Sequence, residues 1–163
     1  MRIIQKVSCA LLLATPAIAL GADSVQITAG RWQEELSFTS VSMNDQEVPK
    51  EKLDAQKATT FACISPAQAR EPSLYFLDQQ PGHNCAAPTG SVAGGRIAMA
   101  STCQMHDEKA GTDLPVAVTM EGTYGPQTYA VNAVADVRTN ERHLVMHMVV
   151  KGRFAGACKG DEE

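Results

Sequence analysis

The stretch that decides the fold is CAAPTGSVAGGRIAMASTC, residues 85–103. From Arg96 to Cys103 its side chains alternate with a period of two, which is typical of a β-strand with two different faces. Two adjacent glycines interrupt the pattern in Ala93-Gly94-Gly95, just before this strand. The sequence therefore predicts a β-hairpin that turns at these glycines.

The register of this hairpin follows from the length of its loop. A three-residue loop, Ala93-Gly94-Gly95, with Gly95 in the left-handed conformation, makes Val92 and Arg96 the first pair. Counting outward from that pair places Cys85 directly opposite Cys103, whereas a two-residue loop of the glycines alone would set Cys103 against Ala86. We therefore expect a hairpin that is closed by a Cys85–Cys103 disulfide.

The first residues indicate export. Arg2 and Lys6 give a positive start, residues 7–20 form an apolar run, and small residues precede Ala22 where a signal peptidase would cut. We expect residues 1–21 to be a cleaved signal peptide and residues 22–163 to form a single β-rich domain. A run of about fourteen apolar residues is shorter than the roughly twenty that cross a bilayer, so we expect no transmembrane anchor. The alternative is a buried N-terminal helix.

The composition of the expected mature domain limits its partners. Removal of two cationic residues leaves 12 Lys and Arg against 18 Asp and Glu, so the net charge changes from −4 to −6. No dense basic segment is present, and binding to nucleic acid or to an anionic membrane is not expected. The remaining 142 residues of the 163 are enough for one domain with a single core.

The cysteines fit an oxidising compartment. Cys9 lies inside the apolar run rather than at its end, so it is a poor acylation site and leaves with the signal peptide. Four cysteines then remain, and an even number in an exported chain indicates two disulfides with three possible connectivities. The hairpin favours Cys85–Cys103 with Cys63–Cys158, and the rival is the sequential pairing of Cys63 with Cys85 and Cys103 with Cys158. No two cysteines have the short C-x₂₋₄-C spacing of a zinc site, so the sequence does not indicate zinc.

The second half of the chain predicts an antiparallel meander with one apolar face. Turns at Gly125-Pro126 and at residues 139–142 put the apolar residues of three successive strands on one side. The expected pairs are Met120 with Val131, Val118 with Ala133, Val116 with Ala135, Val137 with Leu144, Ala135 with Met146 and Ala133 with Met148. A turn around residues 107–112 adds Met99, Ser101, Cys103 and Met105 to the same face, and Pro88 belongs at an edge or a bulge.

The first half of the chain adds two strands and one short helix. One strand runs from Gly30 to the turn at residues 44–46, with Trp32, Leu36 and Phe38 on one face, and a second covers residues 59–64. Ser65-Pro66-Ala67-Gln68 has the pattern of a helix start with a capping box. The fold class is all-β: an antiparallel meander of about seven strands, forming a partly closed barrel or strongly curved sheet, with one short helix after Cys63.

Several short motifs follow one another in a characteristic order. They are Gly30-Arg31-Trp32, Cys63 followed by Ser65-Pro66-x-x-Ala69, Asn84-Cys85, Cys103, and the closing Gly152-Arg153-Phe154-x-Gly156-x-Cys158. This order resembles the small exported family of Gram-negative bacteria catalogued as domain of unknown function 3617, over essentially the whole mature chain. Many members look like lipoproteins; this chain lacks a cysteine at the end of its signal, which favours a soluble periplasmic form. The family has no assigned activity, so the resemblance implies no mechanism.

The sequence offers candidates for a metal site but none for a catalytic site. A copper site is suggested by two histidines, His143 and His147, and the nearby Met146 and Met148, because copper binds both residue types. In a strand, however, the two histidines lie about 13 Å apart on the polar face while the methionines point inward. Met at alternating strand positions is typical of core, so we expect no metal and no cofactor. No G-x-S-x-G elbow occurs and the cysteines are expected to be bonded, so we expect no catalytic residues.

The sequence leaves two functional alternatives. We expect a non-catalytic periplasmic module that binds a partner in the cell envelope or a small molecule. A Met-lined, curved sheet with only eight aromatic residues permits a cavity, so one alternative is a lipocalin-like carrier of a small apolar ligand. A His/Met copper-binding protein is the second alternative. Ligand-binding residues are not assigned by the sequence.

Overall fold

The computed structural model describes residues 25–78, 84–107, 111–139 and 141–160. The expected signal peptide lies outside these residues. Within the part described, no helix has the length and hydropathy needed to cross a membrane. The elements are β1 (Gly30–Met43), β2 (Gln46–Glu47), α1 (Lys50–Asp54), β3 (Ala58–Ile64), α2 (Pro66–Arg70), α3 (Pro72–Asp78), β4 (Asn84–Cys85), β5 (Thr89–Ala93), β6 (Arg96–Asp107), β7 (Thr112–Tyr124), β8 (Thr128–Arg138) and β9 (His143–Gly156).

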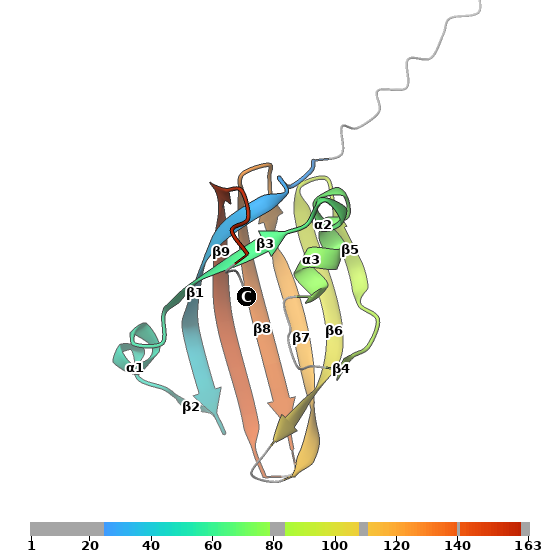
Figure 1. Cartoon of the computed structure of the whole chain (residues 1–163). Helices are drawn as coiled ribbons and strands as arrows, with labels where there is room; N and C mark the ends of the chain where they lie inside the picture. The colour runs from blue at the N-terminus through green and yellow to red at the C-terminus, as the bar shows by residue number, and fades with distance from the viewer. Residues whose placement is uncertain (1–24, 79–83, 108–110, 140, 161–163) are drawn as a thin grey trace, which may run out of the picture.

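The strands form one antiparallel sheet with the order β2-β1-β9-β8-β7-β6-β4. Strand β3 pairs with β1 at one side, and β5 pairs with β6 at the other. The sheet curves strongly but does not close on itself, and its long central strands run side by side behind β3 and α3 (Figure 1). This confirms the expected fold class. Two of the nine strands found in the described residues, β2 and β4, are only two residues long.

The hairpin of β5 and β6 has a shorter loop than the sequence predicts. Ala93 pairs with Arg96 and Val92 with Ile97, so the loop is the two-residue Gly94-Gly95 turn, and the predicted three-residue loop is wrong. Both glycines have positive φ, 58° and 79°, which suits the tight turns that join twisted antiparallel strands.

Cys85 still pairs with Cys103, because the register changes by one residue beyond Thr89. The break falls between β4 and β5, around Pro88, which cannot donate to a strand ladder. The expectation that Pro88 marks an irregularity is confirmed. The break at Pro88 therefore compensates for the shorter loop.

The other registers of the meander test the apolar face directly. Strands β8 and β9 pair as expected, with Ala135 opposite Met146. Between β7 and β8 the expected pairing is wrong by two residues, because Val118 lies opposite Ala135 instead of Ala133. The turn is centred on Pro126 and Gln127, one residue later than expected, and Gly125 N donates to Thr128 O at 2.8 Å. A shift of two residues keeps every side chain on its face, so the concave apolar surface is unchanged.

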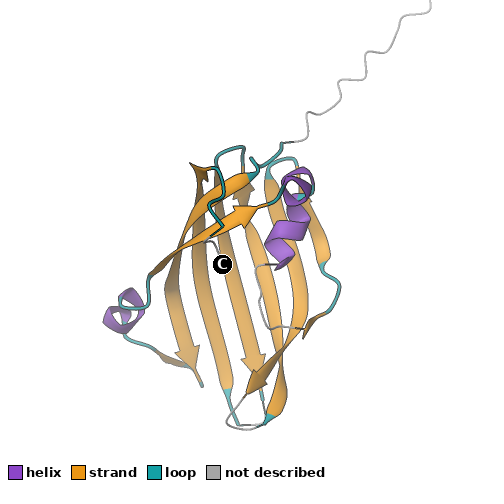
Figure 2. Ribbon diagram, viewed as in Figure 1, coloured by secondary structure: helices purple, strands orange, loops and turns teal. Residues whose placement is uncertain are grey.

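The helix after Cys63 forms as its sequence predicts. The Ser65 side chain accepts from Gln68 N at 3.2 Å and the Gln68 side chain accepts from Ser65 N at 2.9 Å, which is a complete capping box. Pro72 starts a second short helix, α3, shortly after the first one ends. Figure 2 shows α2 and α3 together at one end of the sheet, and α1 beside the opposite margin.

Candidate functional site

The concave face of the sheet contains a cavity of about 470 Å³. Its walls come from strands β1, β3, β6, β7, β8 and β9, so nearly the whole sheet surrounds it. The lining residues are Glu34, Leu36, Ala58, Thr60, Cys103, Met105, Val116, Val118, Met120, Ala133, Ala135, Met146, Met148 and Val150. Most of these are the inward-facing residues of the meander, which alternate along β7 and β8 with more exposed residues on the convex face.

The cavity exists because the aromatic residues gather at one end of the sheet. Six of the eight aromatic side chains form an aromatic cluster whose rings lie 5.3 to 6.1 Å apart between centroids: Trp32, Tyr75, Phe76, Tyr124, Tyr129 and Phe154. Helix α3 contributes Tyr75 and Phe76 and so fills this end. Among the described residues, the core at the other end consists of Met, Val, Leu and Ala side chains and the disulfide-bonded Cys103, which are too small to fill the curve of the sheet.

A buried carboxylate lies where the aromatic cluster meets the cavity. Glu34 is 7% exposed, and its Oε1 accepts hydrogen bonds from the hydroxyls of both Tyr75 and Tyr129. The two hydroxyl oxygens are 3.2 Å apart. Burial raises the pKa of the Tyr129 hydroxyl, and the adjacent Tyr75 and Glu34 raise it further, so this tyrosine stays a protonated donor. Tyr75 and Tyr129 therefore hold the Glu34 carboxylate in place.

The position of this carboxylate follows from the strand registers. Thr60, Glu34, Gly152 and Tyr129 form one row across β3, β1, β9 and β8. Gly152 is essential to this row, because a Cβ at that position would overlap the ring of Tyr129. Without a side chain on β9, the Tyr129 ring lies across the strand and its hydroxyl reaches Glu34.

Glu34 is the site residue that reasoning from the sequence missed. The alternation in β1 that places Trp32 and Leu36 on the inner face also places Glu34 there, since it lies two residues from each. A carboxylate at an inward position of an otherwise apolar strand face was therefore a readable signal. Its tyrosine partners lie 41 and 95 residues away along the chain and had no local signal.

The four cysteines of the expected mature chain form two disulfides, Cys63–Cys158 and Cys85–Cys103. This is the connectivity that the hairpin favoured. Cys85–Cys103 joins β4 to β6, and the buried Cys103 also lines the cavity. Cys63–Cys158 joins β3 to the segment directly after β9, so it fixes that segment to the end of β3.

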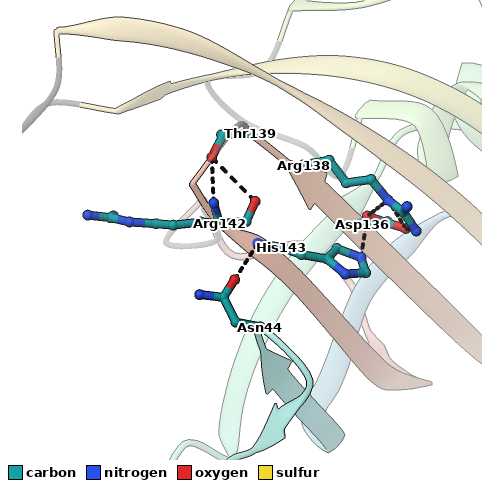
Figure 3. A network of polar contacts seen from close by, with 6 residues as sticks. All are labelled: Asn44, Asp136, Arg138, Thr139, Arg142 and His143. Carbon is teal, nitrogen blue, oxygen red and sulfur yellow. Dashed lines mark hydrogen bonds and ion pairs between the residues drawn. The ribbon is translucent and has the colours of Figure 1, made fainter.

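The two histidines proposed as copper ligands lie apart on β9, and His143 contacts protein groups. His143 Nε2 lies 3.2 Å from Asp136 Oδ1, and the backbone N–H of His143 donates to Asn44 Oδ1 at 2.8 Å (Figure 3). The Arg138 guanidinium holds the pKa of the Asp136 carboxyl below its usual range. His147 is exposed, four residues further along β9.

The methionines beside these histidines, Met146 and Met148, line the cavity on the concave face, as expected. Among the described residues, no three His, Cys, Asp or Glu side chains gather into a group that could hold a metal ion.

The fold and the cavity define a class of protein: a small, disulfide-bonded, open antiparallel sheet that encloses an apolar cavity with one buried carboxylate at its wall. Residues 27–158 match the family model described as protein of unknown function (DUF3617), and the chain belongs to this family. The resemblance found in the sequence is thereby confirmed. No curated protein and no solved structure matches the chain.

Proposed function

We propose that this chain is a non-catalytic binding module that carries a small apolar ligand in the cavity of its concave face, in the manner of a lipocalin. The observation that carries this proposal is the cavity itself. Its volume of about 470 Å³ lies within the range of roughly 300 to 1,000 Å³ that is typical of small-molecule sites. Its lining is almost wholly apolar, so burial of an apolar molecule there is favourable.

The lining also fits a role in binding more than in stability. Met105, Met120, Met146 and Met148 all contribute to the walls, and Met146 and Met148 are only half-buried. Unbranched thioether side chains adapt to differently shaped apolar surfaces, and they are common at sites that accept several ligands. A ligand in the cavity would cover these side chains and complete the core.

The experiment uses N-phenyl-1-naphthylamine, a neutral apolar dye whose fluorescence rises when it leaves water. We expect the mature protein to bind this dye, and Ala135→Phe to weaken binding about tenfold or more because the added ring occupies the cavity. Ala130→Phe is the matched control, since Ala130 is exposed on the other face of the same strand. Equal weakening by both variants, or no binding by either the wild type or the control, contradicts the proposal.

We further propose that the protein acts in the periplasm after removal of residues 1–21. A positive start and a short apolar run with a small-residue cleavage site support this, and two disulfides fit an oxidising compartment. Native mass spectrometry of protein released from the periplasm tests this. We expect a chain that starts at Ala22 and has a mass four hydrogens below that of the reduced chain. Non-covalent mass of lipid size that is lost on denaturation supports the carrier function. An apo chain that binds no dye favours an envelope-interaction module instead.

A further inference from the structure

We propose that the cavity selects amphiphiles with one apolar chain and a protonated amine at the head, with the head at Glu34 and Thr60 and the chain on the methionine wall. This inference rests on the proposed function and adds the class of ligand. It follows from where the polar groups lie in the cavity, from the charge of those groups, and from the nature of the remaining wall.

The polar groups of the cavity converge at one point. Of the fourteen described residues that line it, Glu34 and Thr60 alone have polar side chains. These two residues are direct register partners on β1 and β3, so they lie side by side on one wall. A cavity whose few polar groups are adjacent orients a ligand, because one end of the ligand must satisfy them while the rest contacts apolar surface.

The charge of this point distinguishes between head groups. Glu34 and Thr60 present a carboxylate and a hydroxyl to the cavity, and the hydroxyls of Tyr75 and Tyr129 donate to the same carboxylate. A carboxyl group has several acceptor sites, so several donors can share it, one from a ligand among them. An ammonium head donates to the carboxylate and gains a charge-assisted hydrogen bond, whereas a fatty-acid carboxylate meets a like charge in surroundings of low dielectric.

The rest of the wall suits a hydrocarbon chain. The remaining lining residues are apolar, and four of them are methionines whose side chains adjust to a flexible chain. The formal net charge, −4 for the full sequence and −6 for residues 22–163, also favours the approach of a cation over that of an anion. Head and tail of the proposed ligand therefore each meet a complementary part of the cavity.

The test compares three ligands that share one chain length: dodecylamine, dodecan-1-ol and dodecanoate. Each displaces N-phenyl-1-naphthylamine from the mature, oxidised protein at pH 7, below its own micelle concentration. We expect the amine to bind about tenfold more tightly than dodecanoate, with the alcohol between them, because a hydrogen bond between two charged groups is stronger than one between neutral groups and two like charges repel. Dodecanoate binding as tightly as the amine in the wild type overturns the inference without any variant.

Two isosteric variants locate the preference. Glu34→Gln removes the charge but keeps an oxygen that can accept from Tyr75 and Tyr129, and we expect the amine and dodecanoate to bind it within about twofold of each other. Glu35→Gln is the matched control, because it removes the same charge from an exposed position at the next residue of β1. A preference that survives Glu34→Gln, or that disappears in Glu35→Gln, places the selection on the general surface charge and overturns the inference.

The two proposals fail in different ways. Loss of dye binding in Ala135→Phe together with equal affinity for all three head groups supports the carrier function and rejects only the amine preference. Dye binding that Ala135→Phe leaves unchanged rejects both, because the ligand then lies outside the cavity.

Discussion

At the scale of single residues, the arrangement of the site depends on one missing side chain. Gly152 sits between Glu34 on β1 and Tyr129 on β8, and the Tyr129 ring occupies the space where a Cβ would be. The glycine therefore matters here for close approach and not for an unusual φ, since it is not among the positive-φ residues. Trp32, fully buried, stacks on the same tyrosine with ring centroids 5.4 Å apart.

We expect Gly152→Ala to destabilise the protein by about 1–3 kcal/mol, because the new methyl group forces the Tyr129 ring to move within a packed core. The free energy of unfolding in urea measures this effect. Gly125→Ala is the matched control, since its Cβ would meet nothing nearer than Thr128 O at 3.8 Å and its φ is not positive. Similar stability losses for the two variants would contradict the account of the Glu34–Gly152–Tyr129 row.

At the scale of elements, the two disulfides act on different parts of the sheet. Cys85–Cys103 spans 18 residues and fixes the short strand β4 to the edge of β6 beyond the break at Pro88. Cys63–Cys158 spans 95 residues and joins β3 to the end of the chain. Since loop closure costs more entropy for a longer loop, the second bond restricts the unfolded chain more than the first.

Replacing Cys85 and Cys103 together with Ser should lower the free energy of unfolding by about 3 kcal/mol, and replacing Cys63 and Cys158 by roughly 4–5 kcal/mol. Each double variant should keep the other disulfide. Thiol titration of the denatured protein, without reductant, is the check. Free thiols in the Cys85/Cys103 variant would show that both disulfides are lost and would contradict the pairing. A larger stability loss in the Cys85/Cys103 variant than in the Cys63/Cys158 variant would also contradict it.

At the scale of the whole molecule, packing is uneven along the strands. One end of the concave face is filled by the aromatic cluster and closed by α3, and the other end contains the cavity. Strand β9 runs through both ends and pairs with β1 and β8 along its length. Its backbone hydrogen bonding is therefore similar at the two ends while its side-chain packing differs, which makes β9 a probe of local stability.

We expect the amides of residues 144–148 in β9 to exchange with solvent at least about tenfold faster than those of residues 152–154, because the former face a poorly filled cavity. Hydrogen exchange followed by NMR resolves the two segments within one strand. Addition of the bound dye should slow exchange of residues 144–148 selectively, since ligand binding stabilises the part it contacts. Equal rates in both segments, with or without dye, would contradict a half-filled core.

The sequence by itself determined which residues share a face and where several elements begin and end. Alternation with a period of two placed Met99, Met105, Met146 and Met148 on one surface. The turn between β7 and β8 was predicted one residue too early, which changes the pairing of the two strands by two residues. Such a change leaves every side chain on its predicted face. The capping pattern at Ser65 and the irregularity at Pro88 were also readable, because each depends on the chemistry of neighbouring residues.

Only the tertiary structure decided how the sheet curves and which side chains meet across it. The register break at Pro88 offset the shorter glycine turn, and the row from Thr60 to Tyr129 formed because four strands from distant parts of the chain align. Tyr75 reaches Glu34 from a helix 41 residues away. Such contacts depend on the curvature and docking of the assembled sheet, which no local pattern encodes, and so the cavity and its carboxylate appear only in the folded chain.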